Sequence, residues 1–178
     1  MSAGSDRRLV LLRHAKSAWP EVADHERPLG PRGLRDAPVA GRWLRDASCV
    51  PALVICSTAR RTRETWALAA GQLGTEVPVR YDERVYAAEP EELLEVVSEV
   101  PGDVGTLLLV GHNPGLEELA ISLARKAVAA AETEAIERLS RKFPTSAIAV
   151  LACPVPWQEL APGSARLTDF AVPRGTAR

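Results

Sequence analysis

Two histidines and several arginines of the sequence stand in three short polar segments, each directly after a run of apolar residues. The segments are residues 13–17, 57–65 and 111–115. Arginine presents a planar fork that matches phosphate oxygens, and a neutral imidazole is a nucleophile near pH 7. If the segments converge, His14 and His112 lie among arginines, an arrangement that suits an anion with several charged oxygens, such as a phosphoryl group.

The apolar runs that precede these segments predict strands buried on both faces of a sheet. Together with a fourth run, the expected strands cover residues 9–12, 53–56, 107–110 and 147–151. Helix-like stretches separate them, at residues 31–46, 60–73, 90–100 and 115–130. Strands that alternate with helices predict an α/β fold, a three-layer αβα sandwich with a mainly parallel central sheet. In such sheets ligands bind outside the carboxyl ends of the strands, which is where the polar segments lie.

Three further features refine this prediction. Pro38 lies inside the first helical stretch and is expected to kink that helix or to move its start. The Ala- and Glu-rich residues 127–142 predict a solvent-facing helix, and alternation over residues 166–172 predicts an additional edge strand. Since no repeat or linker divides the chain, residues 1–178 are expected to form one domain with a short N-terminal tail at residues 1–7.

The composition names no activity but excludes several classes of protein. Apolar residues make up 46% and charged residues 25% of the chain, as in ordinary globular proteins, and the net charge is −1. A nearly neutral chain offers no electrostatic case for binding nucleic acid or an anionic membrane. The sequence has no signal-peptide pattern, so we expect a cytoplasmic protein in which Cys49, Cys56 and Cys153 are buried or inert thiols.

Other known types of phosphate-binding or phosphate-transferring site are excluded, because the chain lacks the residue spacing that each of them requires. The chain has neither a P-loop nor a Gly-x-Gly-x-x-Gly segment after a strand. Cys56 could be compared with the nucleophile of a cysteine phosphatase, but the position that should hold an arginine holds Thr62. The histidines lack the spacing of metal ligands. We therefore expect no metal and no cofactor.

The three polar segments also carry a family resemblance. Residues 12–15 (Leu-Arg-His-Ala) resemble the Arg-His-Gly signature of the histidine phosphatase, or phosphoglycerate mutase-like, superfamily. Residues 57–65 resemble its Ser-x-x-x-Arg-Ala-x-x-Thr segment, and Gly111-His112 resembles its second histidine. The chain is most similar to the SixA-type phosphohistidine phosphatases, over about residues 8–152. The stretches that carry this closer similarity are residues 13–17, 26–29, 111–115 and 142–145.

The resemblance implies roles for five residues. His14 would be the nucleophile that attacks phosphorus and carries a transient phosphoryl group. Arg13, Arg61 and His112 would surround the phosphoryl oxygens and neutralise charge in an in-line transition state. Arg27 stands where SixA-like proteins often carry an additional phosphate-facing arginine, with a plain loop charge as the alternative.

A proton donor for the leaving group is expected in residues 81–86. This segment resembles the Leu-Asn-Glu-Arg-His-Tyr segment of the mutases, which places Glu83 at the position of the acid. Asp82 is the second candidate, and Arg84 could simply pair with the carboxylate. A leaving nitrogen of phosphohistidine would depend less on such an acid than an alkoxide would.

Two departures from the mutase pattern favour the smaller phosphatases. Trp19 is followed by proline where mutases often have asparagine, and most of the insertion that covers the mutase substrate is missing. The pocket is therefore expected to be shallow and open. Of the four tryptophans, Trp43, Trp66 and Trp157 are expected in the core, whereas Trp19 could line the rim of the pocket.

The resemblance thus implies a phosphatase that works through a phosphohistidine intermediate and acts on phosphohistidine in proteins. A small-molecule phosphomonoesterase for sugar, glycerate or nucleotide phosphates is the alternative, and a non-catalytic phosphate-binding module is a third reading. The expected partners are a phosphorylated substrate and the product, inorganic phosphate. The expected state is a monomer or a weak dimer.

Overall fold

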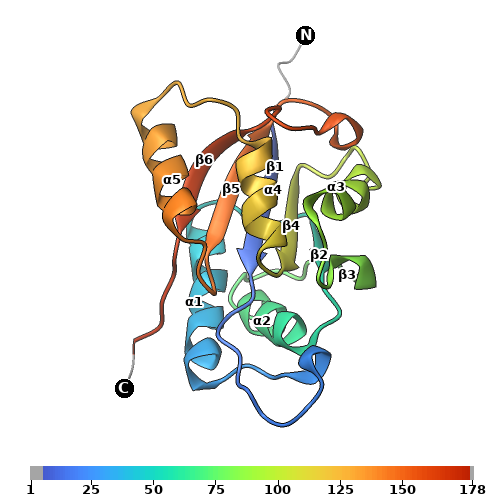
Figure 1. Cartoon of the computed structure of the whole chain (residues 1–178), viewed down its shortest axis with the longest axis vertical. Helices are drawn as coiled ribbons and strands as arrows, with labels where there is room; N and C mark the ends of the chain where they lie inside the picture. The colour runs from blue at the N-terminus through green and yellow to red at the C-terminus, as the bar shows by residue number, and fades with distance from the viewer. Residues whose placement is uncertain (1–5, 177–178) are drawn as a thin grey trace.

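The apolar runs form the centre of a six-stranded sheet with the order β3-β2-β4-β1-β5-β6 in the computed structural model, which describes residues 6–176 (Figure 1). The strands are β1 (Arg7–Arg13), β2 (Leu53–Cys56), β3 (Val79–Tyr81), β4 (Thr106–Gly111), β5 (Ile148–Cys153) and β6 (Arg166–Ala171). Strands β3, β2, β4 and β1 run parallel, and β5 pairs antiparallel with both β1 and β6. The prediction of a mainly parallel sheet is confirmed.

Helices cover both faces of this sheet. The α-helices of the described residues are α1 (Pro31–Asp46), α2 (Arg60–Ala70), α3 (Pro90–Ser98), α4 (Gly115–Leu123) and α5 (Ala130–Arg141), with short 3-10 turns η1 (Asp24–Glu26), η2 (Glu83–Val85) and η3 (Trp157–Glu159). Leu44 of α1 and Trp66 of α2 pack against one face. Leu93, Leu116 and Leu139, from α3, α4 and α5, pack against the other. The predicted three-layer αβα sandwich is therefore confirmed.

Strand β1 shows why its apolar run is continuous. Leu9 and Leu11 pack into the core beneath α3, α4 and α5, whereas Val10 and Leu12 pack into the core beneath α1 and α2. All four side chains are fully buried. Complete burial stabilises the fold by about 1.5–3 kcal/mol for a side chain of this size. The register of β1 is thus firmly set, and Arg13 at its end leaves the sheet at a defined place.

Pro38 neither moves the start of α1 nor divides it. The helix begins at Pro31, whose missing N–H has no intrahelical partner at that position anyway, and runs to Asp46. An interior proline removes one backbone hydrogen bond, here to the carbonyl of Leu34. The side chain of Leu34 is exposed, so this carbonyl lies on the solvent side of the helix. Water can therefore replace the missing donor.

Other predicted boundaries shift. The chain between residues 115 and 142 forms two helices, α4 and α5, because residues 124–129 leave the helix and Ala124 pairs with Ala165. Strand β3 was not expected, since three half-buried or exposed residues give almost no apolar signal. Strand β6 lies at the sheet edge as expected. Strand β1 already begins at Arg7, inside the tail predicted for residues 1–7, and residues 1–5 of that tail lie outside the described residues.

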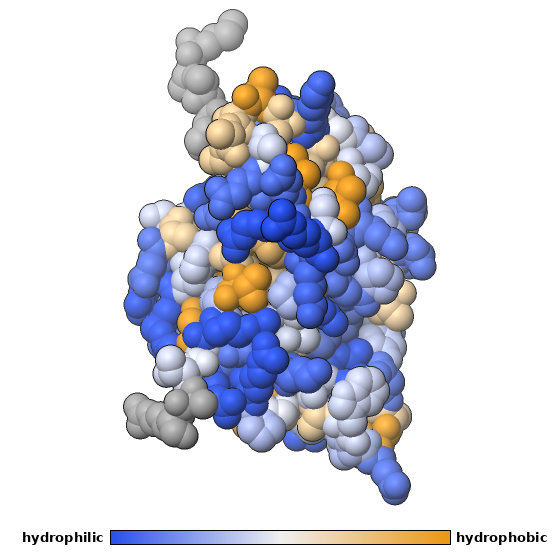
Figure 2. Space-filling model, turned by 60° about the vertical axis from the view of Figure 1, so that its left-hand side comes forward, coloured by the Kyte–Doolittle hydropathy of each residue, from blue (hydrophilic) through white to orange (hydrophobic). Residues whose placement is uncertain are grey.

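The side that carries α1 and α5 is largely hydrophilic. Figure 2 brings it forward, and its apolar groups are small and separated. Helix α5 faces solvent on one side only, because Ala135 and Leu139 are buried. Among residues 6–176, no helix has both the length and the apolar character needed to cross a lipid bilayer.

The three cysteines are free and buried, as expected. Burial raises the pKa of Cys56 and of Cys153 to about 12. Near neutral pH these two thiols therefore stay protonated, and a protonated thiol is a poor nucleophile. Cys56 ends β2 beside the polar segments, but its chemistry is that of a small core residue.

Candidate active site

The carboxyl ends of three neighbouring parallel strands bring the three polar segments together. β1 pairs with β4, and β4 pairs with β2, so the segments that follow them meet at the lower end of the sheet in Figure 1. A cavity of about 230 Å³ opens there. Its lining residues are Arg13, His14, Lys16, Ser17, Trp19, Arg27, Arg61, His112, Asn113 and Thr145. The expected nucleophile, all three expected phosphate-binding arginines and the second histidine thus share one small cavity.

His14 is held so that only one ring nitrogen faces outward. Its Nδ1 lies 2.7 Å from the carbonyl oxygen of Ala15. Because a carbonyl only accepts hydrogen bonds, Nδ1 must carry the proton, and Nε2 keeps its lone pair. Burial lowers the pKa of His14 to about 4; the Ala15 carbonyl opposes this shift, and Arg13, Arg61 and Arg27 add to it. The imidazole is therefore neutral at pH 7, as a nucleophile requires.

His112 faces His14 across the cavity, with 5.4 Å between the ring centroids. Its Nε2 lies 2.8 Å from the hydroxyl oxygen of the buried Ser57. Its Nδ1 is buried and has no hydrogen-bond partner within residues 6–176. If the Ser57 hydroxyl donates to Nε2, Nδ1 carries a proton that can be donated to a phosphoryl oxygen. Burial, followed by His14 and Arg61, lowers the pKa of His112 to about 3.

The stretch 142–145 orients two polar side chains of the cavity through one carbonyl group. The carbonyl of Phe143 accepts a hydrogen bond from Arg13 at 3.0 Å and another from Asn113 at 2.8 Å. The Nε of Arg13 is buried and makes no hydrogen bond to the described residues. Burial lowers the pKa of Arg13, an effect that Glu117 opposes. One guanidinium edge of Arg13 is thus anchored and the other has donor capacity left for a ligand.

The motif around Arg61 also holds the segment that follows β1 in place. The backbone N–H of Ala15 donates to the hydroxyl of Thr65 at 3.0 Å, which ties helix α2 to the residue after His14. Thr62 donates to the carbonyl of Ser57 at 2.9 Å. Arg61 stands in the first turn of α2 and is buried. The spacing from Ser57 to Thr65 therefore fixes the positions of both histidines and of Arg61.

Arg27 lies in the cavity wall rather than in solvent. Its guanidinium stacks on the ring of Trp19 at 3.3 Å, and it hydrogen-bonds to the carbonyl of Ala18 and to the hydroxyl of Ser17. Trp19 as a whole residue is 76% exposed. Trp19 thus lines the rim of the cavity, which was one of the two expectations for this residue. Trp66 and Trp157 are buried in the core.

Asp24 is the residue of the site that sequence reasoning missed. Its carboxylate accepts hydrogen bonds from Arg27 at 2.8 Å, from Arg61 at 3.1 Å and from the hydroxyl of Tyr86. The Tyr86 hydroxyl, then Arg27 and Arg61, hold the pKa of Asp24 well below its usual range, although burial opposes this. Asp24 therefore stays ionised and orients two arginines at once. Its position three residues before Arg27 was the available signal.

Neither candidate proton donor is brought into the cavity. Glu83 is exposed in the η2 turn and is not among the residues that line the cavity. Asp82 is occupied by Arg84, which binds its carboxylate at 2.7 Å and holds its pKa below the usual range. The carboxylate of Asp82 is turned to Arg84 and that of Glu83 to solvent, whereas Tyr86 of the same segment reaches the site through its hydrogen bond to Asp24 and its ring contact with His112.

No cluster of three or more histidine, cysteine or acidic side chains that could hold a metal ion occurs within residues 6–176. The residues that face the cavity are mainly cationic or neutral, and Asp24 is taken up by its own partners. The donor set therefore suits an oxyanion rather than a divalent cation.

Comparison with known proteins identifies the family. The model of the histidine phosphatase superfamily (branch 1) matches residues 9–87. An uncharacterized protein of Mycobacterium tuberculosis is 47% identical over 92% of this chain and 100% of its own length. A solved structure from Nakamurella multipartitia, described as that of a candidate SixA phosphohistidine phosphatase, is 37% identical, with a TM-score of 0.81 and coverage of 96% of this chain and 98% of that one. A second such structure, from Agrobacterium tumefaciens, is 30% identical, with a TM-score of 0.76 and coverage of 94% of this chain and 99% of that one.

The chain belongs to the histidine phosphatase superfamily. Within that superfamily it is SixA-like, as the two solved structures indicate. Family and fold together make it a phosphatase whose chemistry runs through a histidine.

Acidification is expected to destabilise the protein below pH 6.5 because two buried histidines resist protonation. The unfolded chain takes up protons near pH 6.5, whereas folded His14 does so only near pH 4. Stability is therefore fully present above pH 6.5 and falls as the pH drops toward 4. At pH 5 the loss attributable to His14 is about 2 kcal/mol relative to pH 8. Urea unfolding at a series of pH values measures this loss.

The matched variant for this experiment is His14→Gln, which keeps His112 in place. Its free energy of unfolding should fall about 2 kcal/mol less than that of the parent protein over the same pH range. An identical pH dependence of the two proteins would show that His14 is not held neutral by the fold.

Proposed function

We propose that this phosphatase hydrolyses phosphohistidine in proteins, with His14 as the nucleophile and Arg13, Arg27, Arg61 and His112 as the phosphoryl-binding groups. The observation that carries the proposal is the hydrogen bond from Nδ1 of His14 to the Ala15 carbonyl, which leaves a neutral Nε2 in the cationic cavity. The similarity to proteins described as SixA phosphohistidine phosphatases supports the choice of substrate.

In the first step the lone pair of His14 Nε2 attacks phosphorus in line with the bond to the leaving group. The new P–N bond forms as the old P–N bond breaks, and the leaving imidazole nitrogen takes the bonding pair and a proton from solvent. Arg13, Arg61 and the Nδ1–H of His112 stabilise the charge on the phosphoryl oxygens, which is the larger part of catalysis in such transfers. The Ala15 carbonyl stabilises the positive charge that develops on the His14 ring.

In the second step water attacks the phosphorus of phospho-His14. The P–N bond breaks, its electron pair returns to Nε2, the water proton passes to solvent, and inorganic phosphate leaves. The cavity thereby returns to its starting state, with His14 neutral and its Nδ1 proton in place.

The position of the carboxylates favours a leaving nitrogen over a leaving alkoxide. Departure of an alkoxide calls for a positioned acid, and Glu83 and Asp82 lie outside the cavity while Asp24 is held ionised. A histidine nitrogen is protonated readily by solvent near neutral pH, so its departure does not require a positioned acid. Phosphohistidine is therefore the substrate class that these residues suit best.

Substrate competition tests this proposal. We expect kcat/KM for a phosphohistidine-bearing protein to exceed that for each of a panel of sugar, glycerate and nucleotide phosphates by about tenfold or more, and rapid acid-free quenching to trap phosphate on His14. A higher kcat/KM for one of the small esters would assign the enzyme to small-molecule phosphomonoesters instead. Phosphate binding without any trapped phosphoenzyme would support a binding module.

A further inference from the structure

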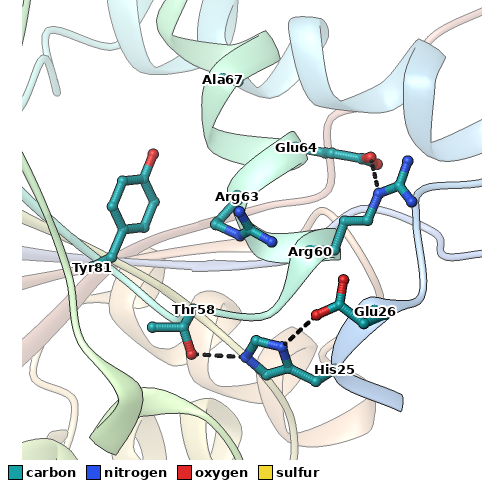
Figure 3. A pocket seen from close by; sticks show the side chains of 8 residues that line it. All are labelled: His25, Glu26, Thr58, Arg60, Arg63, Glu64, Ala67 and Tyr81. Carbon is teal, nitrogen blue, oxygen red and sulfur yellow. Dashed lines mark hydrogen bonds and ion pairs between the residues drawn. The ribbon is translucent and has the colours of Figure 1, made fainter. Parts of the chain in front are cut away.

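A broad hollow of about 830 Å³ lies beside the catalytic cavity (Figure 3). Residues from η1, from the turn between β2 and α2, from α2 itself and from β3 line it. None of them lines the catalytic cavity. The hollow is several times larger than a phosphoryl group needs, and its lining is polar and charged.

At two places, consecutive residues of the chain contact the candidate catalytic site and the hollow. Asp24 binds Arg61 on the catalytic side, and the next residue, His25, faces the hollow and hydrogen-bonds to Thr58 at 2.9 Å. Ser57 holds His112 on the catalytic side, and the next residue, Thr58, lines the hollow. A substrate whose phosphoryl group sits at His14 therefore has the hollow as its immediate neighbour.

Arg63 is the arginine of the hollow that has no ion-pair partner among the described residues. Arg60 pairs with Glu64 at 2.8 Å, and His25 contacts Glu26 at 3.2 Å. Within residues 6–176, Arg63 makes neither an ion pair nor a side-chain hydrogen bond. Figure 3 shows the Arg63 side chain between Arg60 and the ring of Tyr81. A cation placed in this way is complementary to a carboxylate.

Helix geometry sets the reach of a ligand that uses both sites. Arg61 and Arg63 are two positions apart on α2, about 200° around the helix axis, so they project from nearly opposite sides of a cylinder about 10 Å wide. A sugar or glycerate phosphate is too short to span that width. An extended peptide covers it with about three residues, at about 3.3–3.6 Å each. A polypeptide is therefore long enough to reach both sites, as the substrate class proposed above requires.

We propose that this hollow is a second subsite, in which Arg63 and the hydroxyl of Tyr81 bind an acidic side chain about three or four residues from the phosphorylated residue. The inference rests on the proposed phosphohistidine phosphatase activity and names a sequence feature of its substrates. An exposed arginine alone binds a carboxylate weakly, but anchoring of the phosphoryl group at His14 raises the local concentration of the acidic side chain.

The test uses two phosphohistidine peptides that differ only in carrying Glu or Gln three and four residues from the phosphohistidine on both sides. For the parent protein we expect KM for the Glu peptide to be about three- to fivefold lower, with similar kcat. Arg63→Gln should abolish this preference, and Arg63→Lys should keep part of it. Arg42→Gln, which removes an equally exposed charge from α1, should leave it unchanged.

Hydrolysis of p-nitrophenyl phosphate separates failure of the subsite from failure of the proposed function. Arg63→Gln should hydrolyse this small ester at the parental rate, because it has no group that reaches the hollow. If the parent protein hydrolyses both peptides equally well, or Arg63→Gln keeps the preference, the subsite is wrong and the phosphohistidine activity stands. If neither peptide is hydrolysed while the ester is, the proposed substrate fails, and the subsite falls with it. An Arg63-dependent gain for a small bisphosphate would overturn the polypeptide as occupant.

Discussion

Replacement of His14 by alanine is expected to lower kcat for phosphoryl hydrolysis by roughly 10⁴-fold or more, so that the measured rate approaches that of hydrolysis in buffer without enzyme. The reason is that the other candidate nucleophiles are engaged or inert: Nδ1 of His112 is needed as a donor, the Ser17 hydroxyl is bound by Arg27, and Cys56 is protonated and buried in the core. Arginines that bind phosphate cannot form a covalent intermediate in its place. Steady-state assays with p-nitrophenyl phosphate and with a phosphohistidine peptide measure the loss.

Phosphate binding provides the control for this variant. His14→Ala keeps Arg13, Arg27, Arg61 and His112, so it should still bind vanadate or inorganic phosphate, as measured by calorimetry, and it should unfold cooperatively. Loss of activity together with retained oxyanion binding locates the defect in the chemical step. Appreciable hydrolysis by the folded variant would rule out the phospho-His14 intermediate.

The elements of the fold that could be predicted are those whose burial produces a recognisable pattern of apolar residues in the sequence. Strand β1 reads as a continuous apolar run because Leu9 and Val10 face different cores. Strand β3 leaves no such mark, since Val79 and Arg80 are only half-buried, and its place beside β2 depends on pairing that local sequence does not encode. The break between α4 and α5 likewise comes from the pairing of Ala124 with a distant residue.

The grouping of residues in the candidate site was predictable for residues that directly follow strands, but not for residues that come from long loops. His14 and His112 stand directly after β1 and β4, so topology alone brings them together. Asp24 comes from η1 in the long connection to α1, whose path no periodicity describes. The same limit explains Glu83: family spacing put it at the acid position, but the η2 turn and the pairing of Asp82 with Arg84 direct this segment elsewhere.

Replacement of Arg61 by glutamine is expected to lower kcat/KM by roughly 10²- to 10³-fold, the usual effect of removing one preorganised donor from a transition-state site. Both terminal nitrogens of Arg61 are held by Asp24, one by its backbone carbonyl at 2.7 Å and one by its carboxylate at 3.1 Å. This bidentate grip fixes the guanidinium plane before substrate arrives. Lysine offers a single charged nitrogen without that plane, so Arg61→Lys should recover only a small part of the activity.

If Asp24 acts through Arg61, its removal should matter little once Arg61 is gone. Asp24→Asn alone should lower kcat/KM by about tenfold, whereas adding it to Arg61→Gln should change kcat/KM less than twofold, since coupled residues are not additive. Arg42→Gln removes one positive charge, as Arg61→Gln does, but from the exposed side of α1, and it should leave kcat/KM unchanged. Additive effects of Asp24→Asn and Arg61→Gln would mean that Asp24 serves Arg27 or Tyr86 instead, because these are the other two groups that its carboxylate binds.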